Sequence, residues 1–588
     1  MGLKGVLDEL AAEQGDALLL SYLDDITIGT TVDKLDEIFA SIKLKLATYG
    51  LECNIRKCHA WCPNDQPPPS SAGQQRVHVV REGVVVLGCP LGDDSFVRAK
   101  LEALVQQNST LLDRIKTLAT RSAQAASLLV RFCVNTKITY WLRIIDPRSP
   151  HIQEACRNHD VAIQAAAESI CGIPALTSSQ VAQLRLPNSL GGLGLASASQ
   201  TRLAAFYGSA ALVLKDVWRR LQGQGCMGGM DREGFLRVGV VAAYAACRDS
   251  LAQELQPPQS SSSQSSSPNS NLDTLLPPLR TLVGKEDRGR QHKVARAQQH
   301  RARERLLDVL PEADRARVRS CGGVGAGGWT RQVPFDDATT ISNLEWYVIV
   351  RLMLGIPLSA ILDTRGRCVC GQQLDPLGVH LLACNSGKQM FTRHNALVRE
   401  FAQIMRGGGF AVDVEVPILQ LGLPMPANKP NQRMDLVATD ERNQRIMADV
   451  SVTSPTAATF VQGAARGDGH TARQREQAKA SKYRSSIRTL RFVPLVAEAY
   501  GRWGSMCMHF VQDCALRRIR SSSLTGANVD ADSQVVKNQC NMWWQRLSCV
   551  LHKHNAKLLI ERTNAAVTAR QGASRTDNIN DLFTSVIS

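Results

Sequence analysis

The sequence lacks several features that would assign it to a familiar class at once. None of its apolar runs reaches the roughly 18 residues that a membrane-spanning helix requires. The first residues, MGLKGVLDEL, are acidic and amphipathic, unlike a secretory signal. Aromatic residues make up only 5% of the chain, although 44% of it is hydrophobic, and no internal repeat is present. These absences exclude a membrane-spanning protein and predict a soluble, helix-rich one.

Acidic residues are too few to balance the basic ones. Lysine and arginine number 69 against 53 aspartates and glutamates, which gives a net charge of +16. Nucleic acid is the commonest partner for such an excess, and its binding would weaken strongly with salt. The 17 cysteines, without a secretory signal, favour reduced thiols, some bound to metal, over disulfides. We therefore expect an intracellular protein, made in the cytoplasm, that acts on nucleic acid in the nucleus.

The 588 residues are enough for several domains. Short apolar strands alternate with one amphipathic helix, from Asp33 to Tyr49, over residues 16–97, and VHVV (77–80) and GVVVLG (83–88) are expected to form a strand pair. Residues 98–250 are helical by pattern. QPPQSSSSQSSSPNS (256–270) predicts a disordered linker that divides the chain into two halves. Beyond it, residues 285–305 predict a basic helix, whose charges form either a solvated face or a phosphate contact.

Two adjacent aspartates, Asp24 and Asp25, stand between apolar runs in SYLDDITIGT (21–30). The runs LLLSYL and ITIG predict strands, so the aspartates lie at the tip of a hairpin. At about 4 Å and an effective dielectric constant near 20, the two charges repel by about 4 kcal/mol. A divalent cation would turn that repulsion into binding. An ordinary solvated Asp–Asp turn is the alternative.

Several stretches, in this order, resemble the end of a reverse transcriptase palm and the thumb that follows it. YLDD (22–25) is similar to the YxDD metal-binding turn, GLECNIRKC (50–58) to the next motif, and VLGCPLG (86–92) to the primer-grip hairpin. The later stretches LLVRFCVNTKITYWLR (128–143) and PNSLGGLGL (187–195) are similar to the thumb region of non-LTR retrotransposons.

This resemblance implies roles for three residues. Asp24 and Asp25 would bind magnesium, with Asp24 as the main ligand, and Lys57 would protonate the leaving pyrophosphate. The family also needs fingers and an aspartate on an earlier palm strand, whereas only 21 residues precede the YLDD tyrosine. Asp16 lies too close to the turn to be that aspartate. We therefore expect a truncated palm that does not polymerise unaided.

A compact cysteine and histidine cluster stands in RCVCGQQLDPLGVHLLAC (367–384). Its spacing is C-x-C, nine residues, H, three residues, C, and its four members are Cys368, Cys370, His380 and Cys384. Zinc takes four such ligands in a tetrahedral arrangement, and a closed site of this kind is structural. A reduced thiol cluster is the alternative. A second pattern is open between core packing and a zinc site: Cys53, Cys58, His59 and Cys62.

Another set of motifs follows the cluster. In chain order they are TRHN (392–395), PNQRMDLVATDERNQRIMADVSVTSP (430–455) and QAKASKYR (477–484). They resemble the restriction-enzyme-like endonuclease of site-specific non-LTR retrotransposons, in which a CCHC knuckle and an RHN motif precede two aspartates and a displaced lysine. Asp435 and Asp449, separated by thirteen residues, match the aspartates. Lys482 matches the lysine, with Lys479 as the fallback.

The residues themselves support the same chemistry. GFAVDVEV, MDLVAT and RIMADVSVT predict strands, and a turn at DERNQ would pair the last two, so that Asp435 and Asp449 converge. With Glu415 as a third ligand, they would hold magnesium or manganese ions that activate a water, while the lysine stabilises developing charge. Arg393 and His394 would bind phosphate, unless His394 serves the zinc.

We therefore predict a multidomain α+β fragment of a non-LTR retrotransposon protein that nicks DNA for target-primed reverse transcription. Its partners would be target DNA, element RNA and a full-length element protein. The alternative is a remnant that binds nucleic acid without catalysis; a transcription regulator with a zinc module leaves most motifs unused. The predicted segments are a reverse transcriptase palm (1–100), a helical thumb (101–250), a disordered linker (251–275), a basic helical connector (276–365), the zinc knuckle with RHN (366–400), an α/β restriction-like nuclease core (401–500) and a helical end (501–588).

Overall fold

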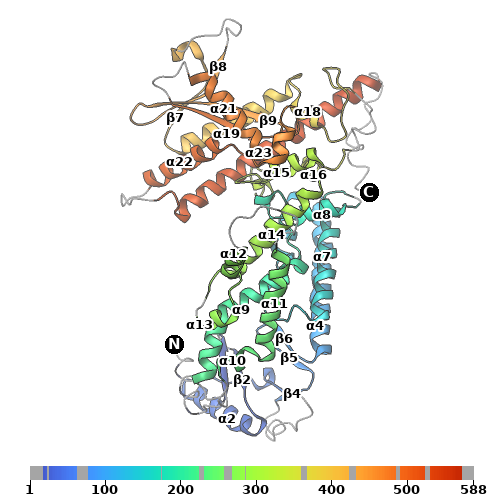
Figure 1. Ribbon diagram of the computed structural model, residues 1–588, viewed down its shortest axis with the longest axis vertical. Coiled ribbons are helices and arrows are strands. Elements are labelled where there is room, and N and C mark those ends of the chain that lie inside the picture. The colour runs from blue at the N-terminus through green and yellow to red at the C-terminus, as the bar shows by residue number, and fades with distance from the viewer. Residues whose placement is uncertain are drawn as a thin grey trace. The chain divides into compact units, whose positions relative to one another are not determined.

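The protein is a mostly helical α+β protein with small sheets, seen here in a computed structural model (Figure 1). The structure describes residues 17–22, 25–62, 77–173, 175–223, 231–256, 268–284, 287–358, 367–422, 432–484, 491–522 and 530–571, together with Gly5, Glu9 and Glu13. Two compact units divide the chain. The first comprises Met1–Thr110, Lys137–Val161 and Ser197–Gln298, and the second comprises Leu111–Thr136, Ala162–Ala196 and Gln299–Ser588. Three of the five boundaries fall within α4 (Asp94–Ala119), α7 (Pro150–Ile170) and α14 (Arg290–Val309), and the other two fall between helices.

The first unit begins with the predicted hairpin and helix. Strands β1 (Leu18–Tyr22) and β2 (Asp25–Gly29) pair antiparallel. Helix α2 (Val32–Thr48) buries Ile38 and Ile42 in the cluster that the hairpin shares. It ends before Gly50, whose φ of +71° is the left-handed conformation that favours glycine. The two strands and the helix are confirmed.

The next strands pair differently from the prediction. VHVV and GVVVLG were expected as a pair, but β4 (His78–Val80) runs parallel to β3 (His59–Trp61), after η1 (Ile55–Lys57). Strand β5 (Gly83–Val86) instead forms a hairpin with β6 (Cys89–Gly92). The reason is the tight turn at Leu87 and Gly88, which both have positive φ and return the chain directly onto β5.

Helices form the rest of the first unit, and they correct the predicted linker. Residues 257–267 lie outside the described residues, but both ends of the predicted 251–275 segment are helical. Arg248 on one side of it pairs with Asp273 on the other at 2.9 Å, because the flanking helices share one core. Residues 251–255 and 268–275 are therefore helical parts of the first unit, and disorder stays a prediction for residues 257–267. The helices are α6 (Thr139–Leu142), α9 (Ala198–Gly223), α10 (Arg232–Leu236), α11 (Gly239–Leu255), α12 (Pro268–Leu275) and α13 (Leu279–Gly284).

A four-stranded mixed sheet organises the second unit. Its order is β10-β9-β8-β7, with β10 parallel to β9 and the other pairs antiparallel. The strands are β7 (Ala411–Pro417), β8 (Arg433–Thr439), β9 (Arg445–Thr453) and β10 (Arg491–Glu498). Asp440 accepts hydrogen bonds from the N–H groups of Arg442 and Gln444 and so fixes the predicted β8–β9 turn. The first three strands are confirmed, whereas β10 was not predicted.

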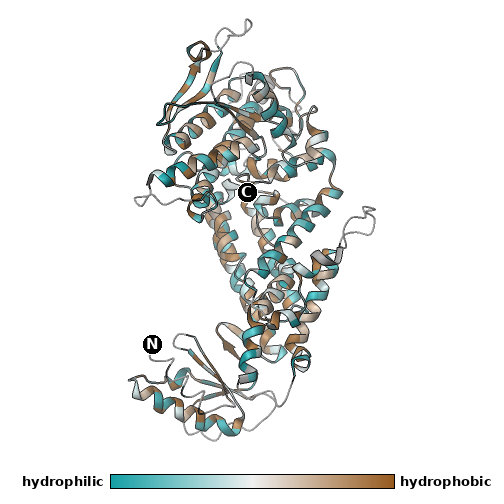
Figure 2. Cartoon of the chain, turned by 60° about the vertical axis from the view of Figure 1, so that its left-hand side comes forward, coloured by the Kyte–Doolittle hydropathy of each residue, from teal (hydrophilic) through white to brown (hydrophobic). Residues whose placement is uncertain are grey.

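Helices surround this sheet, and most of them carry both hydrophilic and hydrophobic residues along their length (Figure 2). Helices α19 (Gln389–Gly407), α22 (Ser505–Ser522) and α23 (Gln534–Gln571) share one apolar core with the strands. This core includes Phe401, Leu436, Leu495, Phe510 and Leu547.

Within the described residues, no helix has the length and apolar character to span a bilayer. The elements are α5 (Ala123–Leu129), η2 (Val130–Val134), α8 (Ser178–Arg185), η3 (Asn188–Leu190), α15 (Glu312–Cys321), η4 (Gly328–Thr330), α16 (Asn343–Leu354), α18 (Val379–Ala383), α19 (Gln389–Gly407), η5 (Ile418–Leu421), α20 (Val461–Arg466), α21 (His470–Arg484), α22 (Ser505–Ser522) and α23 (Gln534–Gln571).

The carboxylate of Asp468, between α20 and α21, interacts with three arginines. Asp468 accepts hydrogen bonds from Arg303 on α14 and Arg319 on α15, both at 2.8 Å, and lies 3.4 Å from Arg502. Burial alone would raise the pKa of Asp468, but the arginines lower it to about 2. Arg303 of the predicted basic helix therefore has a structural partner within the protein.

We expect Asp468→Asn to lower the free energy of unfolding by about 1–3 kcal/mol at pH 7, because it leaves three partly buried arginines without their anion. The folded pKa is depressed, so this stabilisation is present above about pH 4 and is lost as the pH falls towards 2. Urea unfolding at pH 7 and pH 3 measures the difference. Asp513→Asn, which breaks the exposed pair with Arg491, is the control and should change little. An equal effect of Asp468→Asn at both pH values would contradict the assignment.

Candidate metal centres

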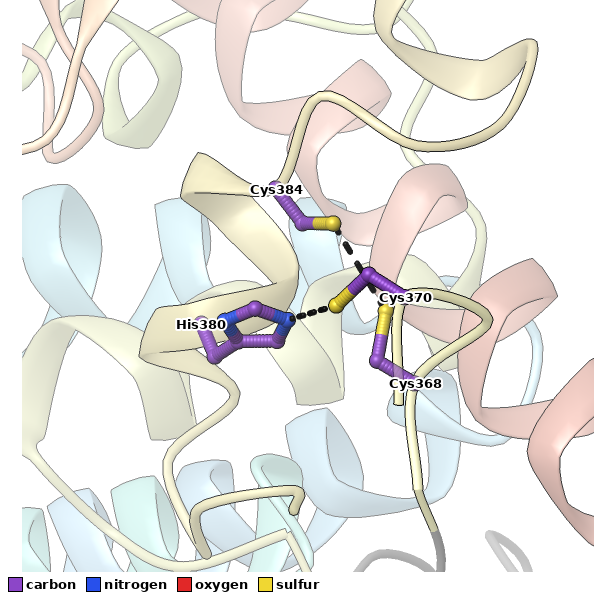
Figure 3. A group of neighbouring side chains, drawn as sticks. All are labelled: Cys368, Cys370, His380 and Cys384. Atoms are coloured by element: carbon purple, nitrogen blue, oxygen red, sulfur yellow. Dashed lines mark hydrogen bonds between the residues drawn. The ribbon is translucent and has the colours of Figure 1, made fainter. Parts of the chain in front are cut away.

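Four side chains converge as the sequence predicts for zinc (Figure 3). The thiols of Cys368, Cys370 and Cys384 and the imidazole of His380 each offer one ligand atom, and these atoms lie within 4.8 Å of one another. Cys370 Sγ lies 3.1 Å from His380 Nε2, and the sulfurs of Cys368 and Cys384 lie 3.7 Å apart. This Cys3His group could bind zinc.

Backbone contacts shape this cluster. Gly371 at φ +86° closes the first turn, and its N–H donates to the carbonyl of Cys368 at 2.7 Å. Asp375 accepts the backbone N–H of His380 at 2.8 Å and thereby anchors the start of α18. Burial would raise the pKa of the Cys384 thiol, but the Ser386 N–H and the neighbouring thiols lower it below its usual value. A lower thiol pKa favours the thiolate that metal binding needs.

The second centre lies across the mixed sheet, where three carboxylates occupy one row. Leu436 pairs with Ala448 on β9 and with Val414 on β7, so Asp435 is in register with Asp449 and Glu415. Opposite residues in a sheet share one face. Both aspartates are 8% exposed. The register therefore places the three acids in one row across β7, β8 and β9. Of the three, Glu415 and Asp435 bring ligand atoms together with His394 within 4.8 Å, whereas Asp449 is not part of that group in the described residues.

Glu415 departs from the regular strand. Its φ is +55°, which a residue other than glycine rarely adopts, and it is missing from a β7–β8 ladder that pairs the residues on either side of it. Such a local irregularity can redirect a side chain. The Glu415 carboxylate lies within 4.8 Å of both Asp435 and the His394 imidazole.

His394 belongs to this centre and not to the zinc cluster. Its Nε2 lies 3.3 Å from Asp435 Oδ1, while Asp435 Oδ2 accepts the N–H of Val450 at 2.6 Å. Burial would lower the pKa of His394, but the surrounding carboxylates raise it. Burial raises the pKa of Asp449, and the charge of Asp435 adds to that effect. The histidine, Glu415 and Asp435 form a possible metal site.

Lys479, the fallback residue, makes the ion pair with Asp449. Lys482 is exposed, and its Nζ lies 4.8 Å from the centre of the Tyr483 ring. Tyr483 is buried beneath β8 and β9 and accepts a hydrogen bond from Gln432 at 2.9 Å. Lys479 precedes Tyr483 by one helical turn, so both lie on the face of α21 that packs on the sheet.

The sequence analysis did not single out Arg475. Its Nε donates to Ser451 Oγ at 3.1 Å, two residues beyond Asp449 on β9. Arg475 also lines an open cavity of about 410 Å³ together with Phe460, Gln474, Gln477, Ala478 and Ser481. The four-residue spacing of Arg475 and Lys479 was a usable signal, because in a helix such as α21 it places two cations on one face.

Arg393 is buried, which argues against the phosphate contact predicted for it. Its side chain is only 2% exposed and donates to Asn555 Oδ1 at 2.8 Å and to the carbonyl of Leu382 at 3.4 Å. Burial, with the nearby charge of Arg562, lowers the pKa of Arg393 to about 10. The arginine joins the zinc cluster and α19 to α23, and no donor is left facing solvent for a ligand.

The polymerase-like residues are only partly placed. Asp24 lies outside the described residues, Asp25 begins β2 opposite Tyr22, and Lys57 is exposed in η1. Across the described residues, neither Asp25 nor the earlier cysteine pattern belongs to a group of potential ligands that converge. That pattern comprises Cys53, Cys58, His59 and Cys62.

Known proteins do not identify this chain. No protein-family model matches its sequence, and no curated protein matches it either.

We expect the purified protein to contain one zinc ion per chain and Cys384→Ser to lose it, because three remaining ligands cannot close a tetrahedral site. The melting temperature should fall by several degrees, since metal binding contributes folding free energy. Elemental analysis and thermal unfolding measure both effects. Cys133→Ser, which replaces an exposed thiol outside the cluster, should keep the zinc. A zinc content unchanged by Cys384→Ser would contradict the predicted ligand set.

Proposed function

We propose that this protein is a metal-dependent endonuclease that nicks DNA, of the restriction-enzyme-like type found in non-LTR retrotransposons. The observation that carries the proposal is the row of Glu415, Asp435 and Asp449 across neighbouring strands, with Lys479 delivered onto it from α21. Carboxylates on a sheet with an adjacent lysine are a recurring arrangement for cleaving phosphodiesters. The zinc cluster and RHN motif precede this sheet in the chain, as they do in that family.

The residues present fit a divalent cation. A bound magnesium or manganese ion would supply an activated water and neutralise charge on the phosphate. Glu415 and Asp435 would hold it, and Asp449 stands beside them in the row. The positively charged Nζ of Lys479 lies beside Asp449, where it would stabilise the negative charge that develops on the phosphate. Arg475, one turn earlier on α21, extends this positive face.

The rest of the chain supplies affinity for nucleic acid. The net charge of +16 favours binding to a phosphate backbone. A small zinc module would hold its cluster rigidly against DNA or RNA. In the retrotransposon setting, a nick frees a 3′ hydroxyl from which a reverse transcriptase copies the element's RNA. Target DNA and element RNA are therefore the proposed partners. The polymerase-like hairpin is proposed to be what remains of the reverse transcriptase, or the part that works with a complete one.

We expect the protein to nick supercoiled plasmid with magnesium or manganese, and not with EDTA. Asp435→Ala and Asp449→Ala should each reduce the rate at least roughly a hundredfold, because each removes a carboxylate at the reacting phosphate. Gel electrophoresis of open-circular product measures the rate. Asp413→Ala, which removes an exposed carboxylate from the same strand as Glu415, is the matched control. Absence of nicking by zinc-loaded, DNA-binding protein would favour a protein that binds nucleic acid without cleaving it.

The two lysines of α21 should differ in their effect on nicking. Lys479→Ala should slow it roughly a hundredfold, because this side chain pairs with Asp449, whereas Lys482→Ala should change it by less than about threefold. Single-turnover rates with bound DNA separate this effect from weaker binding. The opposite order of effects would restore Lys482 as the functional lysine.

A further inference from the structure

We propose that His394 is a direct ligand of the divalent cation, and that the resulting histidine–carboxylate centre prefers manganese to magnesium. The inference rests on the proposed function in one respect, which is that the ion is the one used for nicking. Binding of the ion itself is a separate property and can be measured without DNA.

The geometry around His394 suits coordination. Its Nε2 and one oxygen each of Glu415 and Asp435 lie within 4.8 Å of one another, and the Nε2–Oδ1 distance to Asp435 is 3.3 Å. Ligand atoms bound to one ion at about 2.1 Å stand about 3–4 Å apart. The three donor atoms are therefore already close to the separations that a shared ion imposes.

The chain also holds His394 in this position. Its neighbour Arg393 is buried and tied to Asn555, and two residues later Ala396 and Leu397 enter the core of the sheet. The imidazole itself is 29% exposed, so an ion can reach it from solvent. Glu415 approaches from the opposite strand through its unusual φ. A helix residue and a strand residue thus each bring a ligand atom close to the Asp435 carboxylate.

The donor set decides which ion the centre favours. Magnesium prefers oxygen ligands in near-ideal octahedral geometry and gives up water reluctantly. An imidazole nitrogen binds more favourably to transition-metal ions, and manganese also accepts carboxylates. Carboxylates alone would accommodate both ions, so the preference for manganese comes from His394. The zinc cluster does not compete for manganese, because its thiolates favour softer metals.

The test is a titration of the zinc-loaded full chain with Mn²⁺, followed by electron paramagnetic resonance. We expect one further Mn²⁺ per chain, nitrogen hyperfine coupling from a coordinated imidazole, and displacement by Mg²⁺ only at an excess of at least about tenfold. His394→Gln should abolish the nitrogen coupling and reduce the preference for Mn²⁺ over Mg²⁺ about tenfold. His509→Gln replaces an exposed histidine of the same unit, on α22, and should alter neither.

The outcomes distinguish this inference from the proposed function. Nitrogen coupling or ion preference that persists in His394→Gln, or a wild-type protein that binds no Mn²⁺, overturns the inference. Mn²⁺ bound through His394 without any nicking overturns the proposed function and leaves the ligand assignment in place. Zinc content and thermal unfolding establish that the variant is folded. If His394→Gln does not fold, the spectrum of the wild-type protein still tests whether an imidazole binds Mn²⁺, because oxygen ligands alone give no nitrogen coupling.

Discussion

Buried hydrogen bonds to the long helix α23 fix the arrangement on which both candidate metal centres depend. Arg562 donates to three carbonyls around the end of the zinc cluster, those of Leu381, Cys384 and Ser386. Asn555 accepts from Arg393 on α19 and donates to the carbonyl of Ala499, just after β10. A buried donor without an acceptor destabilises the fold by about 1–3 kcal/mol, so a change that removes one of these acceptors would be destabilising. The cluster, α19 and the sheet are therefore positioned by one set of contacts.

The carboxylate row shows how strand register creates a site that is unfavourable by itself. Three acids on neighbouring strands repel one another, and burial of Asp435 and Asp449 strengthens that repulsion. The protein offsets it with the ammonium of Lys479 on α21, which pairs with Asp449, and with the imidazole of His394 on α19, which lies 3.3 Å from Asp435. These compensating groups come from helices, whereas the acids come from strands. The site therefore exists only when the helices are packed on the sheet.

Local patterns predicted much of this arrangement, and long-range packing decided the rest. The three strands, their turn and the spacing of the cysteine cluster were visible because each depends on neighbours in the sequence. The burial of Arg393 was not, since its partner Asn555 lies 162 residues away. The sequence ranked Lys482 above Lys479, and only the buried position of Tyr483, which orients the helix, shows that Lys479 is the lysine that pairs with Asp449. Strand β10 was missed, although its place in the sheet makes β9 a central strand.

The parallel pairing of β9 with β10 has a consequence for how the protein folds. Ile446 pairs with Arg491, 45 residues later, and the connection between the strands carries α20 and α21. Closing such a long connection lowers the chain entropy before the β9–β10 contacts stabilise the closed state, so non-local pairing of this kind forms slowly. The β8–β9 hairpin can form early and will hold its aspartates without their lysine. The pairing of Lys479 with Asp449 is thus completed only in the late stage of folding, when α21 docks on the sheet.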